Sequence, residues 1–308
     1  MVRPAPQSRA HLWFVGPALA LMVLILLLPI AAAAYLSFTD FTLGGDGADW
    51  VGWKNYDTIF NRSTYSRMFG ATLRYVIVVV PVSVAMGLGA ALLIHSLKRF
   101  GDIYKTIYFL PVMAALIAMA IVWEFALHPT IGVINTTLEM GCGTWLELWP
   151  WYAEGCDRRF PHWLGDRDYA IWTLCFIGIW QGFGFNMVLY LAGLTSIPRD
   201  LYAAAEMDGT ANGWERFRLV TWPLLGPTTV FVVTISVIRS FQVFDTVEAL
   251  TDGGPSRSTY VMMYAIYEKG VQQNLIGVGA AITMIFLIFV MLLTMVQRWL
   301  VERRTHYV

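Results

Sequence analysis

The sequence predicts an all-α polytopic membrane protein with six transmembrane helices. Hydrophobic residues make up 57% of the chain and charged residues only 14%, whereas roughly a quarter of the residues in soluble domains are charged. Six long stretches contain no Asp, Glu, Lys or Arg. Each is close to the roughly 20 residues that a helix needs to cross a hydrocarbon layer of about 30 Å. The zero net charge gives no indication of a nucleic-acid partner.

The uncharged stretches define the expected helices in order along the chain. In hydrocarbon the backbone must satisfy its own hydrogen bonds, so apolar runs of this length are helical rather than barrel strands. The expected helices cover residues 11–37, 71–97, 106–126, 169–195, 219–242 and 271–300. Together with their loops they form a single transmembrane domain over residues 1–308.

The first stretch has the flanks of a secretory signal, because Arg3 and Arg9 precede it and Ala31–Ala34 would suit a signal peptidase. The apolar run from Leu12 to Leu36 is far longer than the roughly 7–15 residues of a signal core. We therefore expect it to be retained as a membrane anchor.

The positions of Lys and Arg predict the orientation, since these residues collect on the cytoplasmic side. With the N-terminus inside, the inner segments contain eleven and the longer outer segments eight. Arg74 and Arg239 lie at or within helices and are left out of this count. We therefore expect both termini in the cytoplasm.

The outer loop 127–168 is rich in tryptophan and contains two of the three cysteines. Two interpretations of the tryptophans remain open: a belt at the membrane interface, or a docking surface for an outer partner that contacts a sugar. Cys142 and Cys156 lie on the oxidising side, so we expect a disulfide that constrains the loop. Cys175 is expected to pack within its helix. No close CxxC pair occurs and only His162 is nearby, which argues against zinc.

The inner loop 195–218 is the most informative segment of the chain. Ser196 is placed to cap a short helix, and Pro198 suits its first turn. Leu201–Met207 is rich in helix formers, and Gly209 can end the helix in the left-handed conformation. The result is a short cytoplasmic helix with small residues on its face, which suits docking into a groove of another protein.

Motifs for catalysis and for nucleotide binding are absent from the sequence. There is no GxxxxGK[ST] phosphate loop, no HExxH, no GxSxG, and no metal-ligand cluster among the five histidines. We therefore expect a non-catalytic chain that binds no cofactor. If it drives transport, the energy must arrive from another subunit through a cytoplasmic contact.

The segment LYAAAEMDGTANGWERFRLVTWPLL, residues 201–225, resembles the EAA loop of ABC importer permeases. In that family the short helix, the Asp-Gly pair and a following Pro-Leu dock on the ATPase. The resemblance implies coupling roles for Ala203, Ala204, Ala205, Glu206, Asp208, Gly209, Trp214, Phe217 and Pro223. The family's leading Glu would stand at Ala203. Glu206 lies three residues further on and nearly on the same helix face, so it could take the place of that Glu. Whether it does so is left open by the sequence.

The resemblance extends over almost the whole chain and is closest to the carbohydrate-uptake branch of maltose, glycerol-phosphate and trehalose type. The matching segments are FVGPALALMVLILLLPIAAAAYLSFTDF, WVGWKNYDTIF, YKTIYFLPVM, HPTIGVINTTL, FNMVLYLAGLTSIPRDLY and SFQVFDTVEALTDGGPSRST. It implies a type I ABC importer permease fold in the bacterial cytoplasmic (inner) membrane. The implied partners are a second related permease, two ATPase subunits that hold ATP and Mg, and an extracytoplasmic solute-binding protein. The implied cargo is a sugar or sugar derivative.

Polar side chains inside the expected helices mark a candidate substrate pathway, because such groups are costly in a bilayer. They are Trp123, Glu124, Asn186, Tyr190, Ser236, Arg239 and Gln242. An aromatic ring beside amide, carboxylate and guanidinium groups suits a hydroxyl-rich ligand. The alternative is that Arg239 and Glu124 pair with each other or extend to the interface.

Two other classes of function compete with an ATP-driven importer. A secondary transporter usually carries mid-helix carboxylates for ion coupling and internal repeats, whereas the expected helices are almost free of acids. A membrane-embedded enzyme needs a clustered acid/base or metal set, which the sequence does not show.

Overall fold

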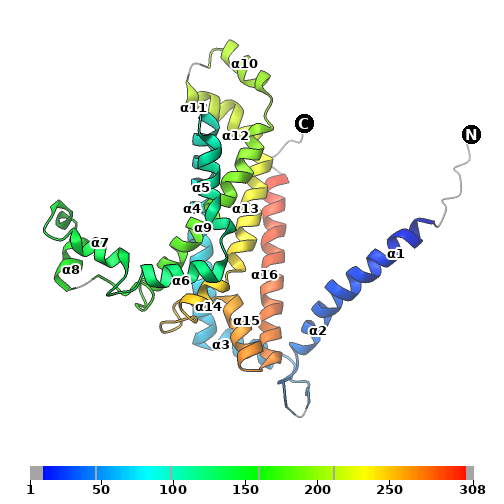
Figure 1. Ribbon diagram of the computed structural model, residues 1–308. Helices are drawn as coiled ribbons and strands as arrows, with labels where there is room; N and C mark the ends of the chain where they lie inside the picture. The colour runs from blue at the N-terminus through cyan, green and yellow to red at the C-terminus, as the bar shows by residue number, and fades with distance from the viewer. Residues whose placement is uncertain (1–9, 46, 98, 159, 211, 303–308) are drawn as a thin grey trace, which may run out of the picture. The chain divides into compact units, whose positions relative to one another are not determined.

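The computed structural model describes residues 10–302 except 46, 98, 159 and 211. The described residues are largely helical and form no β-strand beyond a single bridge between Thr39 and Trp50. Four helices are long and apolar enough to cross a membrane, or up to six if each of two bent helix pairs is one span (Figure 1). The all-α class is therefore confirmed. Arg3, Arg9, Lys98, Arg159, Arg303 and Arg304, which entered the charge count, lie outside the described residues.

The chain divides into two compact units. The first consists of residues up to Arg62 together with Ala265–Phe289, and the second of Ser63–Tyr264 together with the residues from Val290 on. The long C-terminal helix α16, Ile276–Glu302, contributes to both units. We describe each unit by itself.

In the first unit, an apolar helix leads into a segment that hydrogen bonds from Asn55 hold in place. The helix consists of α1 (Ala10–Met22), a π-helical turn (Val23–Leu27) and α2 (Leu28–Leu36), in agreement with the expected 11–37. After it, the buried amide of Asn55 in α3 (Lys54–Asn61) donates hydrogen bonds to the carbonyls of Ser37 at 2.9 Å and Thr39 at 2.7 Å. These bonds fix the chain where it leaves the helix.

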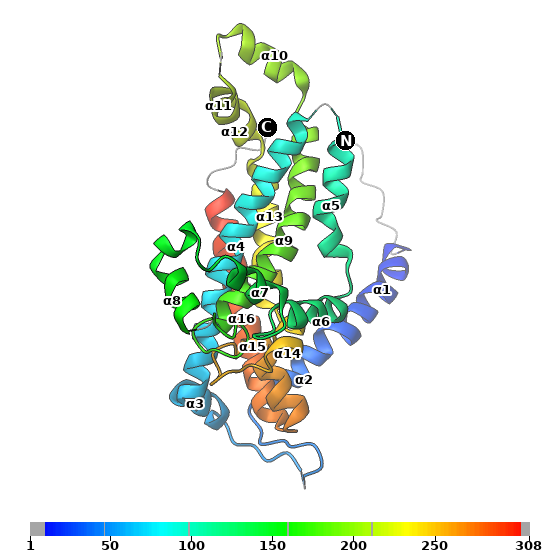
Figure 2. The same ribbon diagram turned by 60° about the vertical axis from the view of Figure 1, so that its left-hand side comes forward.

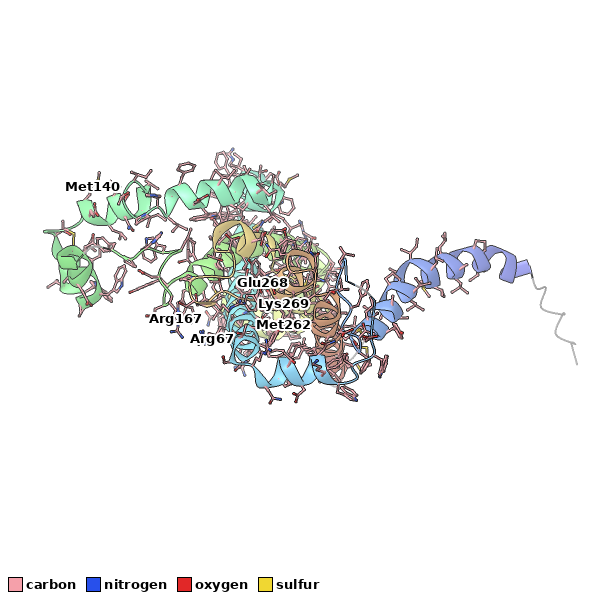
Figure 3. All side chains as sticks on the ribbon, turned by 90° about the horizontal axis from the view of Figure 1, so that it is seen from below. Arg67, Met140, Arg167, Met262, Glu268 and Lys269 are labelled. Carbon is pink, nitrogen blue, oxygen red and sulfur yellow. A yellow bond between two sulfur atoms is a disulfide. The ribbon has the colours of Figure 1, made fainter. Side chains whose placement is uncertain are left out.

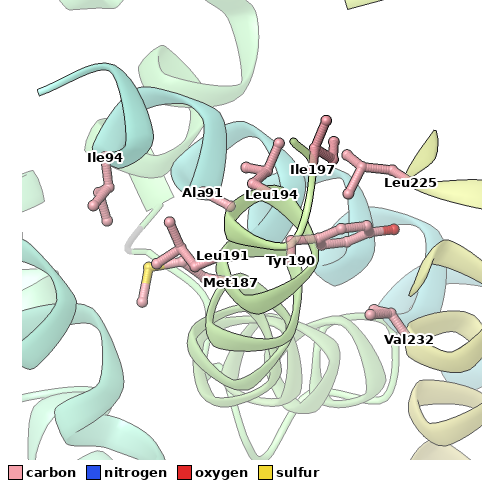
Figure 4. Packing of buried hydrophobic residues seen from close by; sticks show 9 residues of the cluster. All are labelled: Ala91, Ile94, Met187, Tyr190, Leu191, Leu194, Ile197, Leu225 and Val232. Atoms are coloured by element: carbon pink, nitrogen blue, oxygen red, sulfur yellow. The ribbon is translucent and has the colours of Figure 1, made fainter. Parts of the chain in front are cut away.

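The second unit is built on α4 (Ser63–Ser96), α9 (Ala170–Thr195) and α13 (Gly226–Phe241), which pack against one another (Figure 2). The helix α9 matches the expected 169–195, whereas α4 begins at Ser63 rather than 71. The expected start was wrong because polar residues extend α4 beyond its apolar stretch. A hydrophobic cluster joins the three helices: Ala91, Ile94, Met187, Tyr190, Leu191, Leu194, Ile197, Leu225 and Val232 (Figure 4).

Glycines allow α4 and α9 to approach closely. A Cβ added at Gly87 would lie 2.6 Å from Cβ of Asn186 and 3.0 Å from the backbone nitrogen of Met187. On α9, a Cβ at Gly182 would be 3.5 Å from Cβ of Ser83. Small residues at helix interfaces are typical of membrane bundles, since van der Waals packing rather than hydrophobic burial holds such helices together.

Two expected straight helices are bent in the structure. The expected helix 106–126 consists of α5 (Gly101–Met113) and α6 (Leu116–Ala126), which meet at 94°. The residues between them, Ala114 and Ala115, have extended backbone, yet they are apolar, so hydropathy alone does not reveal the break.

The expected helix 219–242 is also wrong at its start. The chain from Gly213 to Leu224 meets α13 at an angle of 68°. This stretch contains α11 (Gly213–Arg216), a π-helical turn (Phe217–Thr221) and α12 (Trp222–Leu224). Pro223 and Pro227 flank the bend, and neither can donate the hydrogen bond that would continue a straight helix. The last helix also begins later than the expected residue 271. Asn274 has a positive φ of 57°, which interrupts the helix, and α16 begins only at Ile276.

The tryptophan-rich loop is folded. It contains α7 (Val133–Met140), a 3₁₀ turn (Trp145–Leu148) and α8 (Pro150–Arg158), and a disulfide joins Cys142 to Cys156. The indole of Trp163 donates a hydrogen bond of 2.6 Å to Asn135, and Phe160 packs against Trp151 and Tyr152. Cys175 is a free, buried thiol in α9.

Candidate functional site

A polar cavity of about 470 Å³ lies within the second unit. Its walls come from α4, from the break between α5 and α6, from α9, and from α13 with the segment that follows it. The side chains and backbone that line it belong to Tyr75, Val79, Ser83, Val112, Ala114, Leu116, Gly178, Gln181, Gly182, Phe185, Asn186, Ser236, Arg239, Ser240, Gln242, Val243, Phe244, Asp245 and Thr246. We call this the central cavity. The bend at Ala114 therefore has a structural consequence, since it brings α5 and α6 onto the wall of the cavity.

The buried wall of the central cavity is an amide and hydroxyl network that joins three helices. Asn186 is 2% exposed, and its Nδ2 donates to Oγ of Ser83 at 3.3 Å. The hydroxyl of Ser236 donates to Oδ1 of Asn186 at 2.9 Å. This pairing satisfies groups that would be costly if left unpaired in a membrane interior. It also fixes the Asn186 side chain, so the polar surface of the cavity is preorganised.

The exposed side of the cavity carries charged and amide groups. Arg239, Gln242 and Asp245 line it, and all three side chains are exposed. The guanidinium carbon of Arg239 lies 3.9 Å from the ring centroid of Phe185, a cation–π contact. Glu124 is exposed, does not line the cavity, and forms no ion pair with Arg239 among the described residues. The structure therefore shows Arg239 at the cavity rather than in a pair with Glu124.

The structure brings together four of the seven residues expected along the pathway: Asn186, Ser236, Arg239 and Gln242. Tyr190 is fully buried in the hydrophobic cluster (Figure 4), one turn beyond Asn186. Trp123 borders a small neighbouring hollow and contacts Trp180 edge-on at 5.4 Å. The two hollows share Leu116, Gln181 and Thr246, so Trp123 lies behind the wall of the central cavity.

Sequence reasoning missed several residues of the cavity. Ser83, Gln181 and Ser240 are polar residues inside the expected helices, so the rule that selected Asn186 applies to them as well. Phe185 had no such signal, because apolar aromatic residues are common in membrane helices. Only its position under Arg239 distinguishes it.

The second candidate site is the loop between α9 and α13. Its helix α10 covers Arg199–Met207, close to the expected 201–207. The expected cap is wrong: the hydroxyl of Ser196 donates to the carbonyl of Gly193 at 2.8 Å and thus bonds back to α9. Pro198 takes the N-cap position, where its missing N–H leaves no donor unsatisfied. The sequence pattern correctly indicated a helix start but assigned the wrong residue to it.

The end of α10 is a Schellman motif. The amide of Thr210 donates to the carbonyl of Ala205 at 3.0 Å, and the amide of Gly209 donates to the backbone carbonyl of Glu206 at 3.2 Å. Gly209 has a positive φ of 93°, a conformation that L side chains rarely adopt. Gly209 therefore ends the helix as expected, directly after Asp208 at the C-cap.

Glu206 is engaged within the loop itself. Its carboxylate lies 2.6 Å from the guanidinium of Arg216 in α11. Both side chains are partly exposed, so the pair contributes only about 0–1 kcal/mol to stability. Its geometric effect is to brace α10 against α11. Trp214 stacks on Phe217 at 5.5 Å, and Pro223 is the second residue of α12, just before the bend.

An apolar surface surrounds α10 and is left exposed. Met207 is 89% exposed and Trp214 is 70% exposed, and Leu201, Ala203 and Ala204 also face outward. Large exposed apolar side chains grouped in this way are typical of protein interaction sites. We call the exposed residues of α10 and α11 the loop surface.

Comparisons with known proteins agree on one family. Residues 83–306 match the model of the binding-protein-dependent transport system inner membrane component. The chain is 26% identical to the probable starch degradation products transport system permease protein of Thermoanaerobacterium thermosulfurigenes, over 99% of both chains. It is 27% identical to the sn-glycerol-3-phosphate transport system permease protein of Agrobacterium fabrum, over 95% of this chain and 94% of the relative.

A solved structure shares the fold. It is a bacterial alginate ABC transporter in complex with an alginate pentasaccharide-bound periplasmic protein. One of its chains matches with a TM-score of 0.80 over 96% of both chains, at 19% identity. At this identity the likeness shows the fold alone.

Proposed function

The chain belongs to the family of binding-protein-dependent transport system inner membrane components, and on this premise we propose that it is one of two pore-forming permease subunits of an ATP-driven sugar importer. One observation carries the proposal. The loop with α10 and α11 connects α9 to α13, and these two helices supply Asn186, Ser236 and Arg239 to the central cavity. A movement imposed on the loop would therefore act directly on the polar wall of the cavity.

The topology that we propose has six spans in the bacterial cytoplasmic membrane. Each of the bent pairs, α5 with α6 and the stretch Gly213–Leu224 with α13, forms one span. Both termini and α10 then lie in the cytoplasm, and the loop 127–168 lies outside. This arrangement follows from the excess of Lys and Arg in the inner segments.

The proposed cargo is a sugar or a sugar derivative that passes through the central cavity. Amide and hydroxyl groups of Asn186, Ser236 and Gln242 can exchange hydrogen bonds with sugar hydroxyls. Arg239 can add bidentate bonds to hydroxyl, carboxylate or phosphate groups. The names of the relatives span neutral and anionic cargo, from starch degradation products to sn-glycerol 3-phosphate. Both kinds are compatible with a wall that combines neutral groups with one guanidinium.

The proposed energy source is a separate ATPase that receives α10 in a groove. The small side chains of Ala203 and Ala204 allow close approach, and the Met207 side chain offers a large apolar contact. Glu206 acts within the loop through Arg216, so the docking contact depends mainly on shape and apolar area. The full assembly contains a second related permease, two ATPase subunits and an extracytoplasmic solute-binding protein. We propose that this chain itself binds no cofactor.

The outer loop offers a contact for the binding protein. Its disulfide closes a folded segment on which Leu148 is 83% exposed and Trp149 is 67% exposed. Exposed apolar residues grouped on a folded segment suit association with a partner protein. Trp163, which bonds to Asn135, has a structural role instead.

Replacement of Arg239 by Gln tests the role of the cavity. We expect normal assembly and normal basal ATP hydrolysis, but substrate affinity at least about tenfold weaker, because one charged hydrogen bond contributes about 1.5–3 kcal/mol. Uptake and assembly should be measured on the same preparation, with Glu124→Gln as the matched control. If Arg239 and Glu124 were a structural pair, both variants would lose assembly. Unchanged uptake by an assembled Arg239→Gln complex would contradict the proposed role.

A further inference from the structure

A second polar cavity lies at the ends of α4 and α9 that are remote from α10. It has a volume of about 210 Å³ and is rich in arginine. Arg67 and Arg74 come from α4, Arg167 from the residues before α9, and Arg257 from the segment after α14 (Asp245–Leu250). Figure 3 shows Arg67 and Arg167 on their two separate elements. We call this the arginine cavity.

The charges of the arginine cavity are only partly compensated. Asp168 is the one carboxylate among the described residues that line it, whereas Arg67, Arg74 and Arg167 each bring a guanidinium group. The fourth arginine, Arg257, is engaged within the chain, because its guanidinium carbon lies 4.4 Å from the ring centroid of Tyr260. Arg67 donates a hydrogen bond of 3.4 Å to the carbonyl of Ser256. Arg74 and Arg167 form no hydrogen bond or ion pair with another described residue. Two exposed guanidinium groups are therefore available to an anion from outside the chain.

The position of the cavity along the helices indicates the membrane interface. Arg74 directly precedes the uncharged stretch Tyr75–Leu97, and Asp168 directly precedes Tyr169–Pro198. The cavity thus lies where both helices leave the hydrocarbon, at the level of the lipid headgroups. Trp172, on the wall of the cavity, is 52% exposed. Half-exposed tryptophan is typical of this level.

We propose that the arginine cavity binds the phosphate of an anionic phospholipid. The planar fork of arginine matches a phosphate group with two parallel hydrogen bonds. A free anion would use only the guanidinium groups, whereas the wall also offers the half-exposed ring of Trp172 to the start of an acyl chain. The outer segments contain basic residues that the usual preference of Lys and Arg for the cytoplasmic side does not explain. Three of them are Arg67, Arg167 and Arg257. Lipid binding gives them a common role.

This inference requires only that α4 and α9 cross the bilayer. It does not depend on the identity of the cargo, on Arg239, or on contact with an ATPase. Its failure would leave the proposed transport function intact, and the reverse also holds.

The test is native mass spectrometry of the assembled complex, taken from vesicles of phosphatidylglycerol and phosphatidylcholine. The variant carries Arg74→Gln with Arg167→Gln, and the control carries Arg62→Gln, which removes an exposed arginine at the end of α3. Each basic residue near an anionic lipid contributes about 1 kcal/mol, so the double variant should bind phosphatidylglycerol at least about tenfold more weakly. The control should retain it. Arg74→Lys with Arg167→Lys should fall between them, because the charge remains and the fork is lost.

Three results would overturn the assignment. Equal retention of phosphatidylglycerol by the assembled double variant and the control would show that the arginine cavity does not bind this lipid. Displacement of the lipid by inorganic phosphate would assign the cavity to a free anion. Loss of stimulation by the solute-binding protein, with phosphatidylglycerol retained, would assign the cavity to that protein.

Discussion

A Gly209→Val variant should insert into the membrane normally and lose essentially all transport. Gly209 ends α10 with a φ of 93°, so a β-branched residue must abandon this conformation or accept strain. The left-handed conformation costs an ordinary residue about 1–2 kcal/mol, which exceeds the contribution of the exposed Glu206–Arg216 pair that braces the loop. We therefore expect α10 to lose its position before it reaches the ATPase. ATP-driven uptake in proteoliposomes, at matched protein amounts, measures the effect.

The matched control for this variant is Gly209→Asn. Asparagine is similar in size to valine, but it tolerates the left-handed conformation. A Cβ at Gly209 meets nothing within 4 Å, so the first carbon of either side chain has room. Asn should therefore preserve much of the transport that Val removes. Equal loss in both variants would show that bulk, not backbone conformation, matters, and normal uptake by Gly209→Val would count against a coupling role for α10.

A Gly87→Leu variant should prevent α4 and α9 from packing. Even the first carbon of a side chain has no room there, since backbone atoms of Asn186 and Met187 lie about 3 Å from its position. Overpacking of this kind costs about 1–3 kcal/mol and sometimes more. Ser83 is one turn from Gly87 on α4 and accepts the hydrogen bond of Asn186, so the wall of the central cavity is displaced as well. We expect a large loss of assembled protein and of uptake.

Gly89→Leu is the internal control, because it lies in the same helix and meets nothing within 4 Å. Both variants replace glycine by leucine in α4, so the helix propensity changes equally. The difference between them isolates the packing of α4 on α9. The yield of monodisperse complex and its thermal midpoint in detergent provide the measurement. Equal yields would contradict the close approach of the two helices at Gly87.

The sequence predicted the helices where composition alone decides them. The bounds of α9 agree with the expected 169–195 because the apolar stretch is long and begins directly after Asp168. The bend between α5 and α6 was not predictable in this way, since Ala114 and Ala115 do not interrupt the apolar run. A hydropathy value reflects the free energy of transferring a residue into lipid, and it does not depend on the backbone conformation. The bend at Pro223 and Pro227 had a local signal, because proline cannot continue the hydrogen bonding of a helix.

The candidate sites show the same division. Asn186 and Tyr190 share a helix face, yet Asn186 meets the central cavity and Tyr190 meets the hydrophobic cluster one turn on. The helical repeat predicts which side chains share a face. It does not predict where along the helix axis the neighbouring helices pack against that face. The arginine cavity lay beyond sequence reasoning, because Arg67, Arg167 and Arg257 meet only in the folded chain. The end of α10 at Gly209, by contrast, is a local device, and the sequence predicted it.

Reconstituted uptake tests the central claim most directly. The chain should be placed in proteoliposomes with its second permease and ATPase subunits, with the solute-binding protein on one side and ATP on the other. Labelled maltose, sn-glycerol 3-phosphate and an alginate oligosaccharide serve as probes. We predict uptake of at least one probe that requires both ATP and the binding protein. Uptake driven by an ion gradient in liposomes that contain this chain alone would identify a secondary transporter and contradict the account.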